Sequence, residues 1–464
     1  MQGGREIIFS PRMGGGWRFA CPSDGGGVTR GMNSARPGLP PACETTVERL
    51  GVEGDGVARH PEGGALFLPF TLPGERVRAV VTHKRGEGWA GTAEVLAASA
   101  ERVEPPCPHF TACGGCTVQH WDDAAYAAWK TGLLAGGLAR AGFAEAVLAP
   151  LQRTPPGARR RMDLALRRVP GGVVVGLHAP RSERVIDIGG CPVLAPALSA
   201  LIPALRALLR TLSSPRREGS AVVNLLDAGP DLLLRLDTVP SMPDRTRLAA
   251  FATAHGLARV TVQIGNGPME PVAVLRPATT RMAGVEVPVP PGGFLQASAE
   301  GEAAIVAAVL AGLPAKMPGR ARIADLYAGN GTLSFALAAR GRVVAYEGDA
   351  AAVAGVRQAA GRGGLGGKVE GVVRDLARQP LGEAELSGFA AVVLDPPHAG
   401  AAAQVARIAA SKVARVIYVS CNPAALGRDG AVLRGAGFKL LSATPIDQFL
   451  WSARLESVCV FARG

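Results

Sequence analysis

The stretch that decides the fold runs from Arg322 to Thr332 and reads RIADLYAGNGT. An apolar run ending at Asp325 leads into a turn with two glycines and then into a segment of helical composition. A strand, glycine turn and helix in this order let backbone N–H groups approach a ligand at the start of the helix. The third glycine of a dinucleotide-binding fingerprint is absent, which counts against a pyrophosphate ligand.

Similar apolar segments follow toward the C-terminus, at residues 343–347, 391–395 and 415–419, separated by alanine-rich stretches. This alternation predicts a doubly wound parallel α/β sheet with its site at the carboxyl ends of the strands. Glu347 ends the second strand, where an acid can accept hydrogen bonds from ribose hydroxyls. A cofactor with a ribose and no phosphate, such as S-adenosylmethionine, fits this pattern.

A cysteine, Cys421, directly follows the strand at 415–419. A lone cysteine is more often a buried structural residue, but Asp395 ends the preceding strand and Glu456 lies in a mainly apolar C-terminal segment. A thiolate can add to carbon 6 of uracil, and the resulting enolate can take a methyl group at carbon 5. A carboxylate then removes the carbon 5 proton. The target base must first be flipped out of its stack.

The motifs Ser-Cys-Asn-Pro at 420–423 and Leu-Glu-Ser at 455–457 resemble those of the RNA uracil-5 methyltransferases, which use S-adenosylmethionine. The resemblance extends from the N-terminal barrel to the C-terminus. It implies that Cys421 is the nucleophile and Glu456 the general base. The residues that it implies for cofactor binding are Gln296, Tyr327, Thr332, Glu347, Asp375 and Asp395.

Three positions depart from the pattern of that family. Thr332 stands where asparagine is common, His398 follows Asp-Pro-Pro where arginine is usual, and Arg454 stands where histidine is frequent. None of these departures removes a group that the mechanism requires.

The sequence of the N-terminal part predicts a fold different from the C-terminal α/β sheet. Short alternating segments at 44–100 with glycine-containing turns predict an OB-like β-barrel, a fold that often binds oligonucleotides; the barrel resembles the RNA-binding TRAM module. We predict four parts in all: a disordered tail at 1–43, this barrel at 44–100, a central α+β domain with an iron–sulfur site at 101–285, and a class I, Rossmann-like methyltransferase domain at 286–464.

The central part contains four cysteines with clustered spacing, Cys107, Cys113, Cys116 and Cys191. Four thiolates suit either tetrahedral zinc or an iron–sulfur cluster, and spacing alone leaves both open. Resemblance to the rRNA-directed branch of the family implies a [4Fe–4S] cluster with a structural or RNA-docking role, and favours large-subunit rRNA over tRNA as the substrate.

The chain of 464 residues carries a formal charge of +12, which suits a polyanionic partner such as RNA. It has no apolar run of the length of a membrane span, so no membrane partner is expected. Clustered cysteines indicate a reducing compartment, so we expect a cytoplasmic protein. We also expect the protein to be a monomer. Met32 is a possible alternative start.

Two alternatives come from other classes. An amino-methyltransferase acting on DNA or protein would also carry Asp-Pro-Pro, at 395–397, but would not need Cys421. A non-catalytic iron–sulfur RNA-binding protein would keep the fold and fail to bind S-adenosylmethionine.

Overall fold

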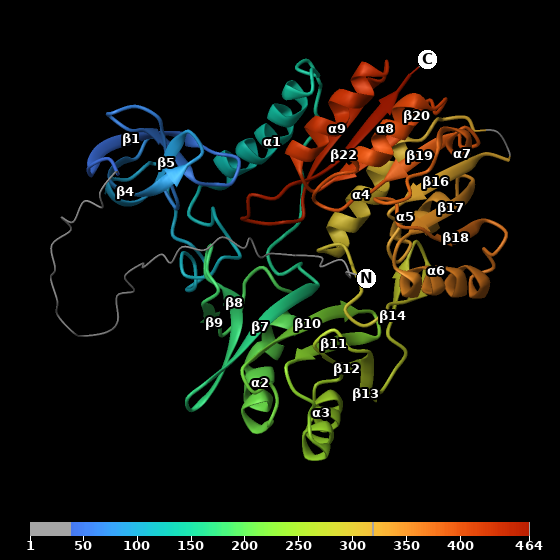
Figure 1. Ribbon diagram of the computed structural model, residues 1–464, viewed down its shortest axis with the longest axis horizontal. Coiled ribbons are helices and arrows are strands. Elements are labelled where there is room, and N and C mark those ends of the chain that lie inside the picture. The colour runs from blue at the N-terminus through green and yellow to red at the C-terminus, as the bar shows by residue number, and fades with distance from the viewer. Residues whose placement is uncertain (1–38, 318–319, 464) are drawn as a thin grey trace. The chain divides into compact units, whose positions relative to one another are not determined.

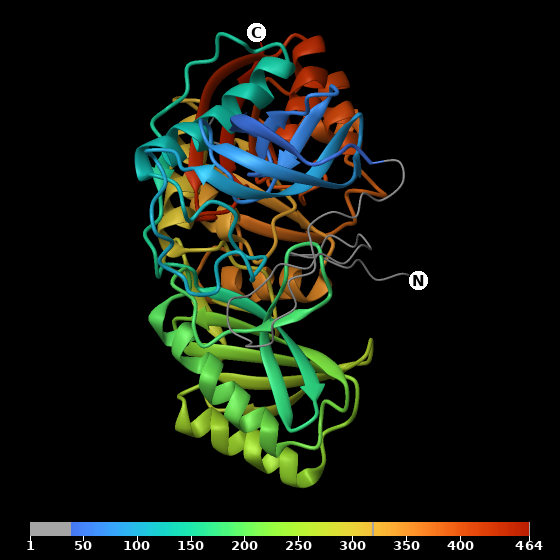
Figure 2. The same ribbon diagram turned by 90° about the vertical axis from the view of Figure 1, so that its left-hand side faces the viewer.

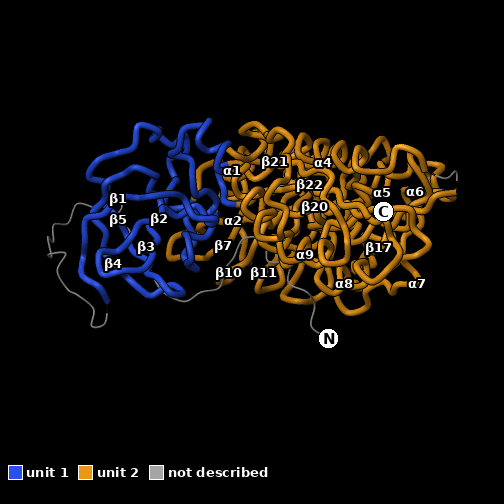
Figure 3. Tube along the Cα trace, turned by 90° about the horizontal axis from the view of Figure 1, so that it is seen from above, with its two compact units in different colours: residues 1–129, 177–187, 451–453 blue, residues 130–176, 188–450, 454–464 orange. Residues whose placement is uncertain are grey.

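The computed structural model describes residues 39–317 and 320–463. The chain divides into two compact units (Figure 3). Unit 1 contains the chain up to residue 129 together with 177–187 and 451–453, and unit 2 contains 130–176, 188–450 and 454–464. The predicted disordered tail falls mostly on residues 1–38, which lie outside the described residues. None of the helices in the described ranges combines the length and the apolar character needed to cross a bilayer.

Unit 1 contains a closed five-stranded barrel, as the N-terminal pattern predicted. Its strands follow the order β1 (Cys43–Leu50), β2 (Gly56–Arg59), β3 (Ala65–Leu68), β5 (Gly88–Ala97) and β4 (Arg76–Arg85). Side chains alternate between the two faces of a strand, so Val47, Leu66 and Val77 fill the interior. Gly56 has to be glycine because a Cβ there would lie 2.0 Å from the hydroxyl of Thr71. Helix α1 (Asp123–Arg140) follows the barrel in the chain.

Unit 2 contains a mixed sheet with the strand order β13-β12-β11-β10-β7-β8. Helices α2 (Pro196–Thr211) and α3 (Met242–Ala254) pack beside it (Figure 2). The strands are β7 (Arg161–Val169), β8 (Gly172–His178), β10 (Glu218–Leu226), β11 (Gly229–Leu236), β12 (Arg259–Ile264) and β13 (Met269–Val274), and β9 (Val185–Asp187) follows β8 in the chain. This mixture of strands and helices agrees with the α+β composition predicted for the central part.

The C-terminal part of unit 2 is an eight-stranded sheet with the order β18-β17-β16-β19-β20-β22-β21-β6 and with helices on both faces (Figure 1). Its first five strands are parallel, and β22 runs antiparallel to both β20 and β21. The strand order reverses at β16, where the chain continues outward on both sides, so a ligand is expected at this switch point. The predicted doubly wound sheet is confirmed. The strands are β6 (Gln152–Arg153), β16 (Arg322–Leu326), β17 (Arg342–Glu347), β18 (Val369–Val373), β19 (Ala391–Leu394), β20 (Arg415–Ser420), β21 (Lys439–Asp447) and β22 (Glu456–Ala462).

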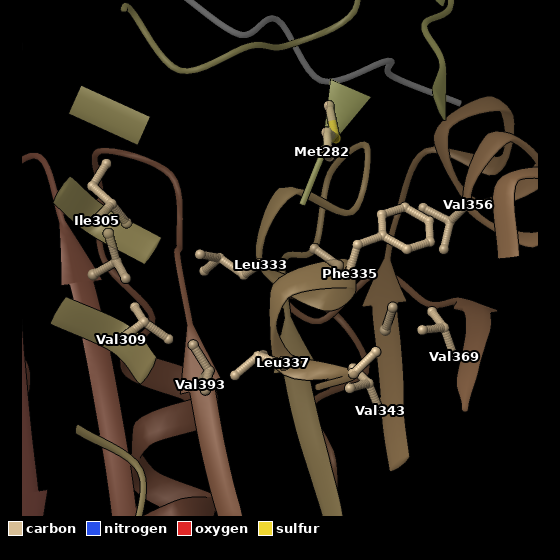
Figure 4. Close-up of a cluster of buried hydrophobic side chains, with 14 of the residues drawn as sticks. Met282, Ile305, Val309, Leu333, Phe335, Leu337, Val343, Val356, Val369 and Val393 are labelled. Carbon is tan, nitrogen blue, oxygen red and sulfur yellow. The ribbon is translucent and has the colours of Figure 1, made fainter. Parts of the chain in front are cut away.

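The helices around this sheet are α4 (Ala299–Gly312), α5 (Thr332–Leu337), α6 (Ala350–Arg362), α7 (Glu383–Leu386), α8 (Ala402–Ala410) and α9 (Pro423–Gly435), and a hairpin, β14 (Thr279–Met282) and β15 (Val285–Pro288), precedes them. A buried cluster joins Ile305 of α4, Phe335 of α5, Val343 of β17, Val356 of α6 and Val393 of β19 (Figure 4). Full burial of such side chains contributes about 1.5–3 kcal/mol each. This core holds the carboxyl ends of the parallel strands in fixed positions.

Candidate active site

Cys421 lies in the turn between β20 and α9. Asn422 forms the N-terminal cap of α9, because its side chain accepts a hydrogen bond from the N–H of Ala424 at 3.0 Å. The hydroxyl of Ser420 accepts the N–H of Asn422 at 3.1 Å, which closes the turn. Cys421 therefore sits half-buried at the carboxyl end of a central strand, where α/β proteins place their sites.

Glu456 is brought to Cys421 by strand pairing. It is the first residue of β22, and Ser457 pairs with Ser420 in the antiparallel register of β22 and β20. Cys421 and Glu456 are the next residues outward on the two strands. Burial, and after it the charge of Asp395, raise the pKa of Glu456 to about 8. The two residues predicted as nucleophile and base are thus neighbours.

A chain of buried side chains connects Glu456 to Asp395. Gln296 donates from Nε2 to Oδ2 of Asp395 at 3.0 Å. Gln448 donates from Nε2 to Oε1 of Gln296 at 2.9 Å and to Oε2 of Glu456 at 2.8 Å. Three of the predicted residues therefore form one hydrogen-bonded group. The sequence reasoning missed Gln448, which no local motif marks.

The glycine turn after β16 meets the end of β17. The N–H of Gly329 donates to Oε2 of Glu347 at 2.9 Å, and Tyr327 has a positive φ of 62°, which is uncommon for a residue with a side chain. Thr332 begins α5, with its hydroxyl 3.6 Å from the sulfur of Met282. Asp375 follows β18, and its Oδ1 accepts the N–H groups of two residues in the next turn.

The carboxylates at this edge of the sheet repel one another. Burial raises the pKa of Asp325 to about 7, and the charges of Asp395 and Glu347 act in the same direction. Burial also raises the pKa of Asp395 to about 6, against the hydrogen bond from Gln296. A positively charged ligand at this edge would relieve the repulsion, because each carboxylate is attracted to it.

The protonation of Cys421 depends on the same charges. Burial first, then Glu456 and Asp395, raise the pKa of the thiol to about 12, whereas the guanidinium of Arg454 lowers it. A thiol with this pKa is protonated at neutral pH, and the thiolate is the reactive form. A cation that bound nearby would therefore activate Cys421 in the same way as Arg454.

Two of the three departures from the family pattern, His398 and Arg454, contact each other. Nη1 of Arg454 lies against Nε2 of His398, and Asn422 donates from Nδ2 to the backbone oxygen of His398 at 2.8 Å. Burial, then the charges of Arg454 and Arg428, lower the pKa of His398. Both residues thus stand beside Cys421, with His398 neutral and Arg454 charged.

A buried ion pair anchors the segment that leads to Glu456. Nζ of Lys130 lies 2.7 Å from Oδ1 of Asp447, and both side chains are fully buried. The same ammonium group donates to the backbone oxygen of Phe449 at 3.2 Å and to that of Arg454. Lys130 therefore contacts Asp447, Phe449 and Arg454, three residues at or near the connection between β21 and β22. Sequence reasoning did not identify Lys130.

The four cysteines of the predicted cluster fall in different units. Cys107, Cys113 and Cys116 lie in unit 1, in the connection between β5 and α1, and Cys191 lies in unit 2 shortly before α2. The N–H of Cys191 donates to the hydroxyl of Ser199 at 3.0 Å. Within 39–317 and 320–463 no group of three or more histidine, cysteine, aspartate or glutamate side chains could hold a metal ion. The structure therefore gives the predicted cluster no support.

Two family descriptions match parts of the chain: the TRAM domain matches residues 43–95, and "Conserved hypothetical protein 95" matches residues 312–418. An RNA methyltransferase of Brucella suis is 40% identical over 438 residues, which are 93% of this chain and 100% of the relative. The 23S rRNA (uracil(1939)-C(5))-methyltransferase of Alkalilimnicola ehrlichii is 38% identical over 436 residues, with 90% of this chain and 96% of the relative covered.

A solved structure shares the fold. The tRNA (uracil-54, C5)-methyltransferase of Pyrococcus abyssi, in complex with S-adenosyl-L-homocysteine, superimposes with a TM-score of 0.66. The alignment covers 90% of this chain and 100% of the other, at 19% sequence identity.

Proposed function

Because this chain belongs to the family of S-adenosylmethionine-dependent RNA uracil-C5 methyltransferases, we propose that it methylates one uridine of 23S rRNA through a covalent bond to Cys421. The observation that carries the proposal is the pairing of β20 with β22, which sets Cys421 beside Glu456. A nucleophile and a base at adjacent strand ends can act on the two neighbouring carbons of one pyrimidine ring.

Each residue has a role in the proposed reaction. The sulfur of Cys421 bonds to carbon 6 of the flipped uracil, and the ring electrons move to carbon 5. S-adenosylmethionine supplies the methyl group when it is bound. Glu456 takes the carbon 5 proton, and the electron pair of that C–H bond restores the double bond and releases Cys421 as a thiolate. The protein is therefore regenerated at the end of the reaction.

Binding of the cofactor is proposed for Gln296, Tyr327, Thr332, Glu347, Asp375 and Asp395. The repulsion among Asp325, Asp395 and Glu347 supports this, since S-adenosylmethionine carries a positive sulfonium. Glu347 is the acid placed for ribose hydroxyls, because it ends β17 beside the glycine turn. The sulfonium would also favour the thiolate of Cys421 and the carboxylate of Glu456.

A 23S rRNA substrate is supported by the name of a relative that is 38% identical over nearly the whole chain. A tRNA substrate is the second candidate, from the name of the solved Pyrococcus abyssi enzyme. The test is to incubate the purified protein with labelled S-adenosylmethionine and total RNA from a strain that lacks the gene, and then to map the labelled nucleotide. Label at carbon 5 of a 23S rRNA uridine is expected, and label confined to tRNA would contradict that choice.

We also propose that Cys107, Cys113, Cys116 and Cys191 bind a [4Fe–4S] cluster; the support is the donor chemistry of four thiols together with the resemblance to the rRNA-directed branch. Protein purified without oxygen should contain about four iron atoms and four sulfides per chain. Cys113→Ser should lose most of the iron, and Cys43→Ser, outside the set, should keep it. Stoichiometric zinc in place of iron would contradict the proposal.

A cytoplasmic location and a monomeric state stay predictions from the sequence. The amino-methyltransferase alternative predicts instead that Cys421→Ala keeps its activity.

A further inference from the structure

The amide of Gln448 is fixed in one orientation by the backbone. Its Oε1 accepts the N–H of Ala297 at 3.0 Å. Because a backbone N–H can only donate, the oxygen of the amide must face Ala297 and the nitrogen must face the other way. Nε2 then donates to both Gln296 and Glu456, at 2.9 and 2.8 Å. The direction of each hydrogen bond in the buried chain follows from this one backbone contact.

The same geometry makes the two oxygens of Glu456 unequal. Oε2 accepts the hydrogen bond from Gln448. Oε1 is buried and has no hydrogen-bond partner among the described residues. A buried polar atom without a partner is costly and calls for an explanation, of which a catalytic role is one.

We propose that Gln448 is a positioning residue for proton removal: it holds Oε2 of Glu456, so that Oε1 is the oxygen that accepts the proton from carbon 5 of the methylated uracil. This inference rests on the proposed function and adds to it the residue and the atom. The carboxylate gains the proton at Oε1, the C5–H electron pair forms the C5–C6 double bond, and the Cys421 thiolate leaves. Gln448 itself gains and loses nothing.

The side chain of Gln448 packs closely against Gly301. Gly301 of α4 lies so close that a Cβ on it would be 2.7 Å from Cβ of Gln448 and 3.0 Å from its Oε1. Real Cβ contacts are not this short, so an alanine at 301 has to displace Gln448. The chain thus offers two independent ways to disturb the same contact.

The order of the chemical steps makes the role measurable. Methyl transfer comes before proton removal, so a weakened base stalls the reaction with Cys421 still joined to methylated RNA. Gln448→Met keeps the side-chain volume and removes the donor. At saturating S-adenosylmethionine and pH 7 we expect turnover to fall roughly ten- to hundredfold, the range for losing one hydrogen bond to a charged catalytic group. Protein–RNA adduct stable to denaturation should accumulate on natural uridine RNA.

The pH profile supplies a second readout. Burial, and after it the charge of Asp395, raise the pKa of Glu456 to about 8, whereas the hydrogen bond from Gln448 and the backbone N–H of Ser457 lower it. Without the bond from Gln448 the pKa rises further, so a smaller fraction of Glu456 is ionised at neutral pH. The defect of Gln448→Met should be greatest below about pH 8 and should shrink as the pH rises above it.

The matched control is Gln404→Met. Gln404 is a buried glutamine whose amide accepts from the N–H of Leu381 at 2.8 Å and donates to the oxygen of the same residue at 3.3 Å, away from Glu456. Gln404→Met should lose about as much stability as Gln448→Met, but it should not accumulate the protein–RNA adduct. Gly301→Ala should show the adduct to a smaller extent.

The outcomes separate the two proposals. If Glu456→Gln accumulates adduct while Gln448→Met and Gly301→Ala, folded and able to bind S-adenosylmethionine, do not, then Gln448 does not position the base. If neither the wild type on 5-fluorouridine RNA nor Glu456→Gln gives adduct, the covalent mechanism itself fails.

Discussion

Cys421→Ala is expected to abolish methylation, with a loss of about 10⁴-fold or more, because its sulfur is the atom proposed to bond to carbon 6. Carbon 5 of uracil is too weak a nucleophile to accept a methyl group unaided. The thiol makes no hydrogen bond that closes its turn, since Ser420 and Asn422 do so. The fold and the affinity for S-adenosylmethionine should therefore be unchanged, as measured by thermal unfolding and by calorimetric titration.

Cys459→Ala is the control for this variant. Cys459 is also buried, with a pKa likewise raised to about 12, but it lies in β22 opposite Tyr418 and away from the strand end. It should retain methylation. RNA with 5-fluorouridine should trap the wild type, because the base cannot remove fluorine, and the crosslink should map to Cys421. Full activity of Cys421→Ala would instead favour the amino-methyltransferase alternative.

Lys130→Met is expected to destabilise the protein by about 3–5 kcal/mol, the usual cost of leaving one partner of a buried ion pair uncompensated. Asp447 would keep a buried charge without its ammonium partner, and the oxygens of Phe449 and Arg454 would lose a donor. Urea unfolding followed by fluorescence or circular dichroism measures the change. Turnover should fall as well, because this segment carries Gln448 and ends at Glu456.

Two comparisons test the cause of that loss. Lys412→Met removes an exposed lysine and should change stability by less than about 0.5 kcal/mol. The double variant Lys130→Met with Asp447→Leu removes both charges and should recover part of the loss, since the uncompensated charge is gone. A double variant that is as unstable as the sum of the two single variants would show that the ion pair is not the cause.

The contact between His398 and Arg454 explains how two unusual residues can stand in one site. Each departs from the family pattern at a position that sequence treats separately, yet the two side chains touch beside Cys421. Arg454 supplies a positive charge there, and this charge lowers the pKa of the Cys421 thiol against the effect of burial. The departures therefore keep a positive charge next to Cys421.

Local patterns determined the elements of this protein. The strand, glycine turn and helix around Asp325, the later strand ends and the alternating segments of the barrel were readable because periodicity and turn chemistry act within a few residues. The resemblance then singled out Cys421 and Glu456. It did so by residue type and neighbours, without any information on how β20 and β22 pair.

Which distant side chains meet depends on the tertiary fold. Gln448 bonds to Gln296 across 152 positions of the chain, and Lys130 reaches Arg454 across 324. Neither residue belongs to a motif, because its role depends on strand order and on burial, which place an amide and an ammonium group where unpaired partners would otherwise be costly. Local sequence patterns therefore predicted the fold class, and the resemblance proposed which residues react, whereas long-range packing determined which side chains surround them.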